Sequence, residues 1–150
     1  MEKKYELTNE TKEYQGRVLH RIRALKDFGG VRAGDLGGWV EKEGNLSQFG
    51  ACWVYGDALV YGNALVCGYA RVYGNARVYG DALVFENARV YGDAQVYGNA
   101  RVYGDALVFE NARVYGNAVI TGCMHIQKKK RLSHCWPRWQ SERFHHLRQR

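Results

Sequence analysis

The sequence predicts an all-β protein in which short parallel strands wind into a β-solenoid. Three observations predict this class. Residues 49–126 divide into thirteen hexads without an insertion. The 150-residue chain has 18 Gly but a single Pro, which indicates many tight turns. The segment "YGNARVYGDALVFENARV" also occurs twice without a difference, at 73–90 and 97–114. Such a fixed short period determines the fold before any single residue does.

Each hexad predicts one short strand followed by one sharp turn. The consensus is aromatic, Gly, Asp or Asn, Ala, variable, Val. Ala–x–Val predicts a three-residue strand with Ala and Val on one face and the variable residue on the other. The aromatic–Gly–Asp/Asn segment predicts the turn, because these residues tolerate positive φ. The period and the frequent Gly exclude the heptads of a coiled coil.

The first 48 residues predict a β capping segment. "KYELT" and "RVLHRIRAL" indicate two strands joined by the polar "NETKEYQG". "GGVRAGDLGGWV" then leads into the first coil, where we expect Trp39 and Trp53 to plug the core. A cap is needed because a solenoid exposes strand edges at its ends; a recognition role is the alternative. The predicted parts are a cap at 1–48, a solenoid at 49–126 and a basic tail at 127–150.

The hexads resemble those of the hexapeptide-repeat left-handed parallel β-helix, in which an aliphatic residue is followed four positions later by a small residue, with Asn or Asp just before it. The segment "RIRALKDFGGVRAGDLGGWVEKEGNLSQFGACWVYGDA" and the "YGNA" units also resemble the YdcK-like β-solenoid proteins of bacteria and bacteriophages, over about residues 3–126. The resemblance implies a left-handed helix with three hexads in each triangular 18-residue coil. General chirality would favour a right-handed crossover instead. The resemblance implies no activity.

On this fold, the aliphatic side chains stack in three interior columns, one at each corner of the prism, and Ala fills the narrower space. Each buried Val contributes about 1.5–3 kcal/mol. The expected columns are Val54, Val72, Val90 and Val108; Val60, Val78, Val96 and Val114; Val66, Val84, Val102 and Ile120; with Ala58, Ala76, Ala94, Ala112 and their equivalents beside them.

The outer surface carries the candidate interaction residues. Aromatic residues at the turns lie about 4.8 Å apart in neighbouring coils, which suits ring stacking. The predicted aromatic columns are Tyr55, Tyr73, Tyr91 and Phe109, and Tyr61, Tyr79, Tyr97 and Tyr115. The outward variable positions are Arg71, Arg77, Arg89, Arg101 and Arg113, mixed with Leu59, Leu65, Leu83, Leu107 and Gln95. These residues form either a surface for a glycan or protein partner, or a structural ladder beside a solvated face.

The distance between the two identical segments is 24 residues, which is four hexads. With three hexads in a coil, the second copy is rotated by one face of the prism, so Arg77 and Arg101 belong to different faces. We therefore expect that no single face is dedicated to catalysis or binding, and that function lies at the ends or in the overall shape.

The repeat body lacks the residues that hexapeptide-repeat acyltransferases need. Their chemistry uses a general base, usually His, and no His occurs between Val54 and Ile120. We expect no catalytic residue, no cofactor and no metal. A metal site at the C-terminal Cys and His residues is disfavoured by their spacing; these are Cys123, His125, His134, Cys135, His145 and His146. An enzyme that uses an N-terminal group such as His20 is the alternative.

All of the net charge lies in the tail. Residues 1–127 contain 14 Lys or Arg and 14 Asp or Glu, whereas residues 128–150 contain eight Lys or Arg and one acid. The tail is expected to be basic and disordered, with weak nucleic-acid binding as its only predicted contact. The residues for that contact are Lys128, Lys129, Lys130 and Arg131. Adenine-rich codons for the lysines would also allow a reading-frame slip there, in which case 128–150 is not an evolved module.

The leading interpretation is a non-enzymatic scaffold or interaction protein. Its partner is then an unknown protein, or a second copy that associates through the solenoid ends. The alternatives are an acyltransferase-like enzyme and a phage factor that binds a host protein. With no apolar run of about 20 residues, no signal peptide and four Cys without a CxxC pair, we expect a cytoplasmic location and reduced structural thiols.

Overall fold

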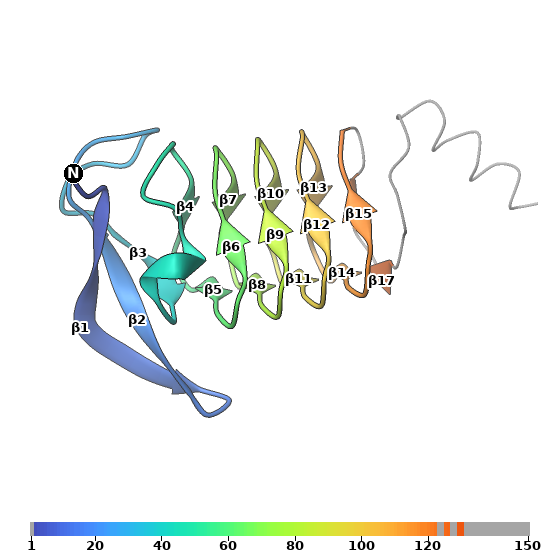
Figure 1. The fold of residues 1–150 in the computed structure, drawn as a ribbon, viewed down its shortest axis with the longest axis horizontal. Coiled ribbons are helices and arrows are strands. Elements are labelled where there is room, and N and C mark those ends of the chain that lie inside the picture. The colour runs from blue at the N-terminus through green and yellow to red at the C-terminus, as the bar shows by residue number, and fades with distance from the viewer. Residues whose placement is uncertain (1, 123–124, 127–128, 131–150) are drawn as a thin grey trace, which may run out of the picture.

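A computed structural model describes residues 2–122, 125–126 and 129–130, the last two pairs by their backbone path alone. The chain forms an all-β solenoid whose short strands stack in parallel along the long axis (Figure 1). The predicted fold class is therefore confirmed, and its left-handed winding stays a prediction. No helix in the described ranges is long and apolar enough to cross a membrane.

The N-terminal part contains the only long strands of the described chain. These are β1 (Tyr5–Tyr14), β2 (Arg17–Ala24) and β3 (Leu36–Val40), followed by a 3-10 helix, η1 (Glu43–Asn45). The solenoid then continues in two-residue strands: β4 (Trp53–Val54), β5 (Leu59–Val60), β6 (Leu65–Val66), β7 (Arg71–Val72), β8 (Arg77–Val78), β9 (Leu83–Val84), β10 (Arg89–Val90), β11 (Gln95–Val96), β12 (Arg101–Val102), β13 (Leu107–Val108), β14 (Arg113–Val114), β15 (Val119–Ile120), β16 (His125–Ile126) and β17 (Lys129–Lys130).

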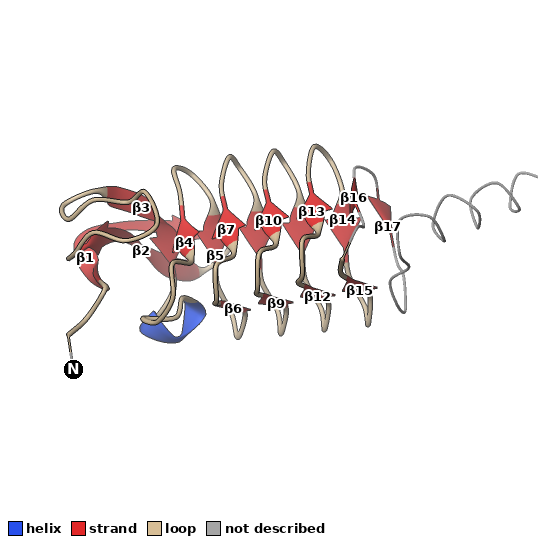
Figure 2. Cartoon of the chain, turned by 90° about the horizontal axis from the view of Figure 1, so that it is seen from above, coloured by secondary structure: helices blue, strands red, loops and turns tan. Residues whose placement is uncertain are grey.

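The strands form three sheets, one on each side of the coil (Figure 2). The first sheet has the order β1-β2-β3-β5-β8-β11-β14-β17, the second β16-β13-β10-β7-β4 and the third β15-β12-β9-β6. Every third hexad thus pairs, so that Val54 lies beside Val72 and Val72 beside Val90. The three predicted columns of Val and Ile are confirmed, and their side chains are fully buried.

The strands are one residue shorter than predicted. In most hexads the N–H of Ala bonds back to the carbonyl of the residue three positions earlier, as from Ala76 to Tyr73 at 3.4 Å. Ala therefore closes the turn, and the ladder begins at the next residue. Consequently, the Val columns lie within the sheets, just before each turn, and not at the corners of the prism.

The turns require a left-handed backbone at the Gly position. Gly74 has φ +68°, and a methyl group there would lie 2.9 Å from the backbone nitrogen of Gly92 in the next coil. Glu86 and Glu110 adopt φ of 57° and 55° at the same position of their hexads. Because such a φ is unfavourable for residues with a Cβ, the stacked coils impose it on these two.

The N-terminal hairpin differs from the prediction. β1 runs to Tyr14, and only Gln15 and Gly16, with φ of 49° and 78°, form the turn. The predicted loop "NETKEYQG" is therefore wrong for its first six residues. Two residues with positive φ close a hairpin tightly, and the polar residues remain in an edge strand with a register shift between Leu7 and Thr11.

The hairpin joins the solenoid through β3. β2 pairs with β3 in antiparallel, and β3 pairs with β5 in parallel, with Trp39 beside Leu59 and Val40 beside Val60. Parallel stacking thus begins before residue 49, the predicted start of the solenoid. Gly38 takes the place of an Ala here, since a methyl group on it would lie 2.7 Å from the carbonyl oxygen of Ala58.

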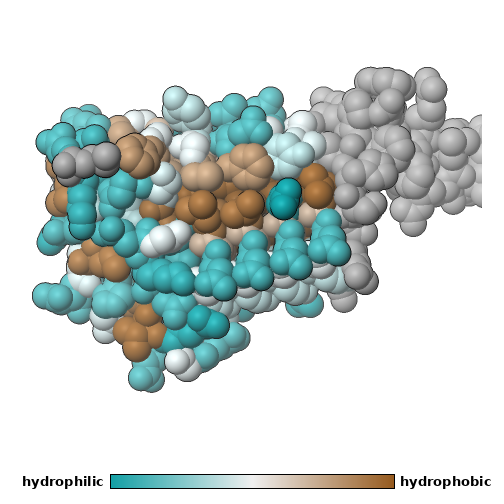
Figure 3. Space-filling model, viewed as in Figure 1, coloured by the Kyte–Doolittle hydropathy of each residue, from teal (hydrophilic) through white to brown (hydrophobic). Residues whose placement is uncertain are grey.

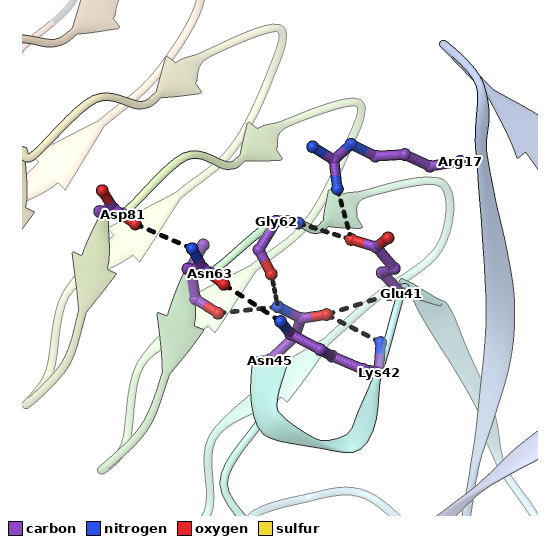
Figure 4. Close-up of polar contacts among 8 residues, drawn as sticks. Arg17, Glu41, Lys42, Asn45, Gly62, Asn63 and Asp81 are labelled. Carbon is purple, nitrogen blue, oxygen red and sulfur yellow. Dashed lines mark hydrogen bonds and ion pairs between the residues drawn. The ribbon is translucent and has the colours of Figure 1, made fainter.

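The buried side chain of Asn45, at the end of η1, ties the first coil to the next one (Figure 4). Its buried Nδ2 donates to the carbonyls of Gly62 at 3.1 Å and Ala64 at 2.8 Å. Its Oδ1 accepts the backbone N–H groups of Glu41 at 3.1 Å and Lys42 at 2.9 Å. A buried amide with these partners is well satisfied, and it fixes the irregular coil against the first regular one.

Candidate interaction surface

The strand register determines which outward side chains are neighbours. Arg77 lies in the first sheet and Arg101 in the third, as predicted from the 24-residue distance between the identical segments. The outward columns are Leu59, Arg77, Gln95 and Arg113 in the first sheet; Trp53, Arg71, Arg89 and Leu107 in the second; and Leu65, Leu83, Arg101 and Val119 in the third.

The third sheet presents an apolar strip with one polar interruption (Figure 3). By strand register its outward residues include Leu65, Leu83 and Val119, which are half-buried, and Arg101, which interrupts the strip. A row of polar corners runs beside the strip, in which Asn63 Nδ2 donates to Asp81 Oδ1 at 3.2 Å. A groove of about 400 Å³ lies between strip and row and is lined by Asp81, Leu83, Asn99, Arg101, Asn117 and Val119.

The aromatic residues at the corners stack as predicted, with one exception. Neighbouring rings are nearly parallel, with centroids 4.9 Å apart for Tyr79 and Tyr97 and 4.8 Å apart for Tyr73 and Tyr91. Tyr55 and Tyr73 are the exception, since their planes meet at 83°. A further stacked pair, Phe85 and Tyr103, was not predicted, because Cys67 and Thr121 flank it in that column and interrupt the run of aromatic residues.

The hairpin covers one end of the second predicted aromatic column. Tyr61 is only 4% exposed, because the ring of Tyr14 packs edge-on against it at 5.7 Å. The guanidinium of Arg77 lies over the ring of Tyr14 at 5.2 Å. Burial raises the pKa of Tyr61 to about 12. Tyr61 is therefore part of the core around the hairpin, whereas Tyr79, Tyr97 and Tyr115 continue the column toward the C-terminal end.

Both predicted capping tryptophans are buried at the N-terminal end. Trp53 lies in register with Arg71, an outward position, and the rings of Tyr5 and Phe28 pack edge-on against it at 6.1 and 5.2 Å. Trp39 also occupies an outward position, beside Leu59, with the guanidinium of Arg21 4.5 Å from its ring. The N-terminal segment thus covers both indoles from outside, and neither plugs the axis of the coil.

The groups with potential chemistry are held in structural contacts. Lys4 Nζ is buried, donates to the carbonyl of Cys52 at 2.8 Å and lies 3.3 Å from Cys52 Sγ. Burial lowers the pKa of Lys4 and raises the pKa of Cys52, which favours their neutral forms. His20 Nδ1 lies 3.1 Å from the carbonyl oxygen of Thr8 within the hairpin.

The remaining sequence candidates lie outside the part described with side chains. They are Cys123, His125, His134, Cys135, His145 and His146 for a metal, and Lys128, Lys129, Lys130 and Arg131 for nucleic acid. Among the residues that the structure does describe, no three His, Cys, Asp or Glu side chains are grouped to hold a metal ion.

Comparison with known proteins agrees with this architecture. Residues 54–68, 70–92 and 94–110 match the model of the family described as "YdcK Beta solenoid repeat". A segment of 38 residues is 47% identical to the protein named "Uncharacterized acetyltransferase YdcK" from Escherichia coli (strain K12). That segment covers 25% of this chain and 12% of the relative, so the chain matches only a small part of that protein. The chain is therefore a β-solenoid repeat protein, and its repeats are similar to those of the YdcK β-solenoid family.

Proposed function

We propose that the protein is a non-enzymatic β-solenoid that acts as a scaffold or protein-interaction module. One observation carries the proposal. The two identical segments form equivalent strands and turns, but these lie on different faces of the solenoid. Arg77 therefore belongs to the first sheet and Arg101 to the third. A repeat used in this way supplies shape and stability, because each coil adds its own contacts with its neighbours.

The described side chains support this reading chemically. A nucleophile is activated when a base lies within hydrogen-bond reach. Cys52 has Lys4 as its neighbour, but both are buried beneath the N-terminal segment. His20 Nδ1 contacts the backbone carbonyl of Thr8 within the hairpin. Neither group faces the outer surface as an activated pair.

An acyltransferase-like enzyme is the second candidate. The name of the E. coli relative favours it, although the match covers 12% of that protein. His20 is the group of the described chain that we would assign as general base in such an enzyme, because it is half-buried on β2 and belongs to the hairpin beside the first coil.

Release of free coenzyme A from acetyl-CoA, measured with a broad panel of amine and hydroxyl acceptors, separates the two functions. We expect no acceptor-dependent release by the full chain. Turnover that depends on the acceptor and disappears in His20→Gln would overturn the non-enzymatic proposal.

The interaction role needs a positive test. The full chain serves as bait in a bacterial lysate, and a captured protein is then purified and mixed with it. We expect a complex of defined stoichiometry that weakens when an outward residue such as Arg89 is changed to Glu. A complex that no outward substitution weakens would contradict the proposed use of the outer surface.

A further inference from the structure

At one corner of the solenoid, two neighbouring coils lack the backbone hydrogen bond that joins the coils at the corners from Asn63 to Asn99. At each corner from Asn63 to Asn99, the residue after the turn Gly or Glu donates its N–H to a carbonyl in the next coil, as from Asn75 to Gly92 at 2.8 Å. Within the described structure, no such bond joins Asp57 to Gly74.

Two further observations place the opening at the same corner. The ring centroids of Tyr55 and Tyr73 are 6.1 Å apart at 83°, whereas those of Tyr73 and Tyr91 are 4.8 Å apart at 2°. A methyl group on Gly56 would meet nothing within 4 Å, although one on Gly74 would meet the next coil at 2.9 Å. Tyr55 has therefore turned out of the ladder where two coils separate.

The opening continues into a groove beside the second sheet. This Tyr–Arg groove has a volume of about 350 Å³ and is lined by Tyr55, Arg71, Tyr73 and Arg89. A volume of this size is typical of sites for small ligands or for a single large side chain.

The groove contains the only two arginines that are direct neighbours in the outward columns described above. Arg71 and Arg89 lie side by side on β7 and β10. Elsewhere Gln95 separates Arg77 from Arg113, and Arg101 lies between Leu83 and Val119. Like charges directly opposite each other on neighbouring strands are destabilising.

These two charges have no carboxylate partner among the described residues. The four ion pairs among the described residues use Lys3, Arg17, Arg21 and Arg23 as their cations. An anion between Arg71 and Arg89 would remove their repulsion, and two planar guanidinium groups match the oxygens of a carboxylate or phosphate. The hydroxyl of Tyr73 is protonated at neutral pH, as that of any tyrosine is, and can donate a further hydrogen bond; burial raises its pKa further still.

We propose that the Tyr–Arg groove binds an aromatic anion. The carboxylate or phosphate pairs with Arg71 and Arg89, and the attached flat ring packs against Tyr55 and Tyr73, which favour offset or edge-on ring contacts. The proposal deepens the interaction function above by naming the chemistry of the ligand. It also singles out one face, which differs from the sequence-based expectation, because the register makes only this arginine pair adjacent.

Calorimetric titration of the full chain at low salt tests the proposal, with phenyl phosphate as the ligand. Inorganic phosphate supplies the anion without the ring, and phenol supplies the ring without the charge. We expect saturable binding of phenyl phosphate, at least about tenfold tighter than either. Equal binding of phenyl phosphate and inorganic phosphate would reduce the site to an adventitious ion and overturn the proposal.

The matched variants are R71Q/R89Q and R101Q. Gln occupies the equivalent position at Gln95, so the fold should accept it, and the single variant R89Q replaces the double variant if circular dichroism shows unfolding. We expect at least about tenfold weaker binding in R71Q/R89Q and unchanged binding in R101Q. Equal losses in both variants would indicate a general charge effect and refute the site.

A peptide with a phosphotyrosine side chain distinguishes the source of the ligand. Tighter binding than phenyl phosphate supports the groove as a contact for a partner protein, and equal binding supports it as a site for a free small molecule. The proposed non-enzymatic function is tested separately by the acetyl-CoA assay, whose outcome does not depend on the groove.

Discussion

Replacing Gly74 by Ala tests how closely the coils approach at the corners, and Gly56 provides the matched control. The two residues occupy successive positions of one corner, with φ of +68° and +57°. A methyl group on Gly74 would lie 2.9 Å from the nitrogen and 3.1 Å from the oxygen of Gly92. One on Gly56 would meet nothing within 4 Å. The two substitutions thus share the backbone cost and differ in steric contact.

The expected free energies follow from these two terms. A left-handed φ costs a residue with a Cβ about 1–2 kcal/mol, and the stiffer unfolded chain offsets about 0.4–1 kcal/mol of it. Gly56→Ala should therefore lose about 0–1.6 kcal/mol of unfolding free energy. Forcing a methyl group into a packed site adds about 1–3 kcal/mol, and this addition is the expected excess of Gly74→Ala.

Urea denaturation followed by far-ultraviolet circular dichroism measures both losses, provided that the slope with denaturant stays unchanged. Gly98→Ala repeats the test in another corner, since its methyl group would also lie 2.9 Å from the next coil. Equal losses for Gly56→Ala and Gly74→Ala would refute the reasoning, because the cost would then be conformational and the approach of the coils would not limit the turn residue.

Three other changes have defined outcomes. Asn75→Asp places a third carboxylate between Asp57 and Asp93 in one corner column and removes the bond from Asn75 Nδ2 to Asp93 at 3.3 Å. We expect a lower Tm that 1 M salt largely restores, because salt screens the repulsion between the carboxylates. A loss of Tm that does not depend on salt would contradict this expectation. The pKa of Tyr61 is about 12 in the folded chain and about 10 in the unfolded chain, so the folded state keeps the proton to higher pH. The free energy of unfolding therefore falls as pH rises from 10 to 12. In Tyr61→Phe, the Tm from thermal unfolding should fall less steeply over this range. Lys4→Met leaves the carbonyls of Gly50 and Cys52 without their donor and should cost about 1–3 kcal/mol in urea denaturation. An unchanged midpoint would contradict this expectation.

The regular coils could be predicted from the sequence because each hexad repeats the same pattern of turn and strand residues. The columns through Val54, Val60 and Val66 follow from the period alone, since every residue with the same place in a hexad meets its equivalent three hexads later. The turn also follows from local chemistry, although Ala closes it and shortens the strand.

The irregular parts could not be predicted, because they depend on contacts between distant residues. Nothing in "KEYQG" shows that Tyr14 will cover Tyr61. The first coil does not follow the hexad pattern, because Gly38 replaces Ala and the chain forms a 3-10 helix that the side chain of Asn45 bonds to the next coil. The Tyr–Arg groove was missed for a similar reason. The period of three hexads already places Arg71 beside Arg89, but the hexad pattern does not show that the ring of Tyr55 leaves the aromatic ladder and opens the groove.

Because the hexads are interchangeable, the gain or loss of a single hexad would change which outward side chains are neighbours on the surface. The interior places Val over Val whichever hexads meet, so loss of one hexad would leave the core intact while every later side chain moves to the next face. Deleting residues 79–84, for example, would bring Gln95 beside Arg71 and carry Arg89 to a different sheet. Gain or loss of single hexads, which repeated DNA readily undergoes, would therefore create new outer patterns without a single amino-acid substitution.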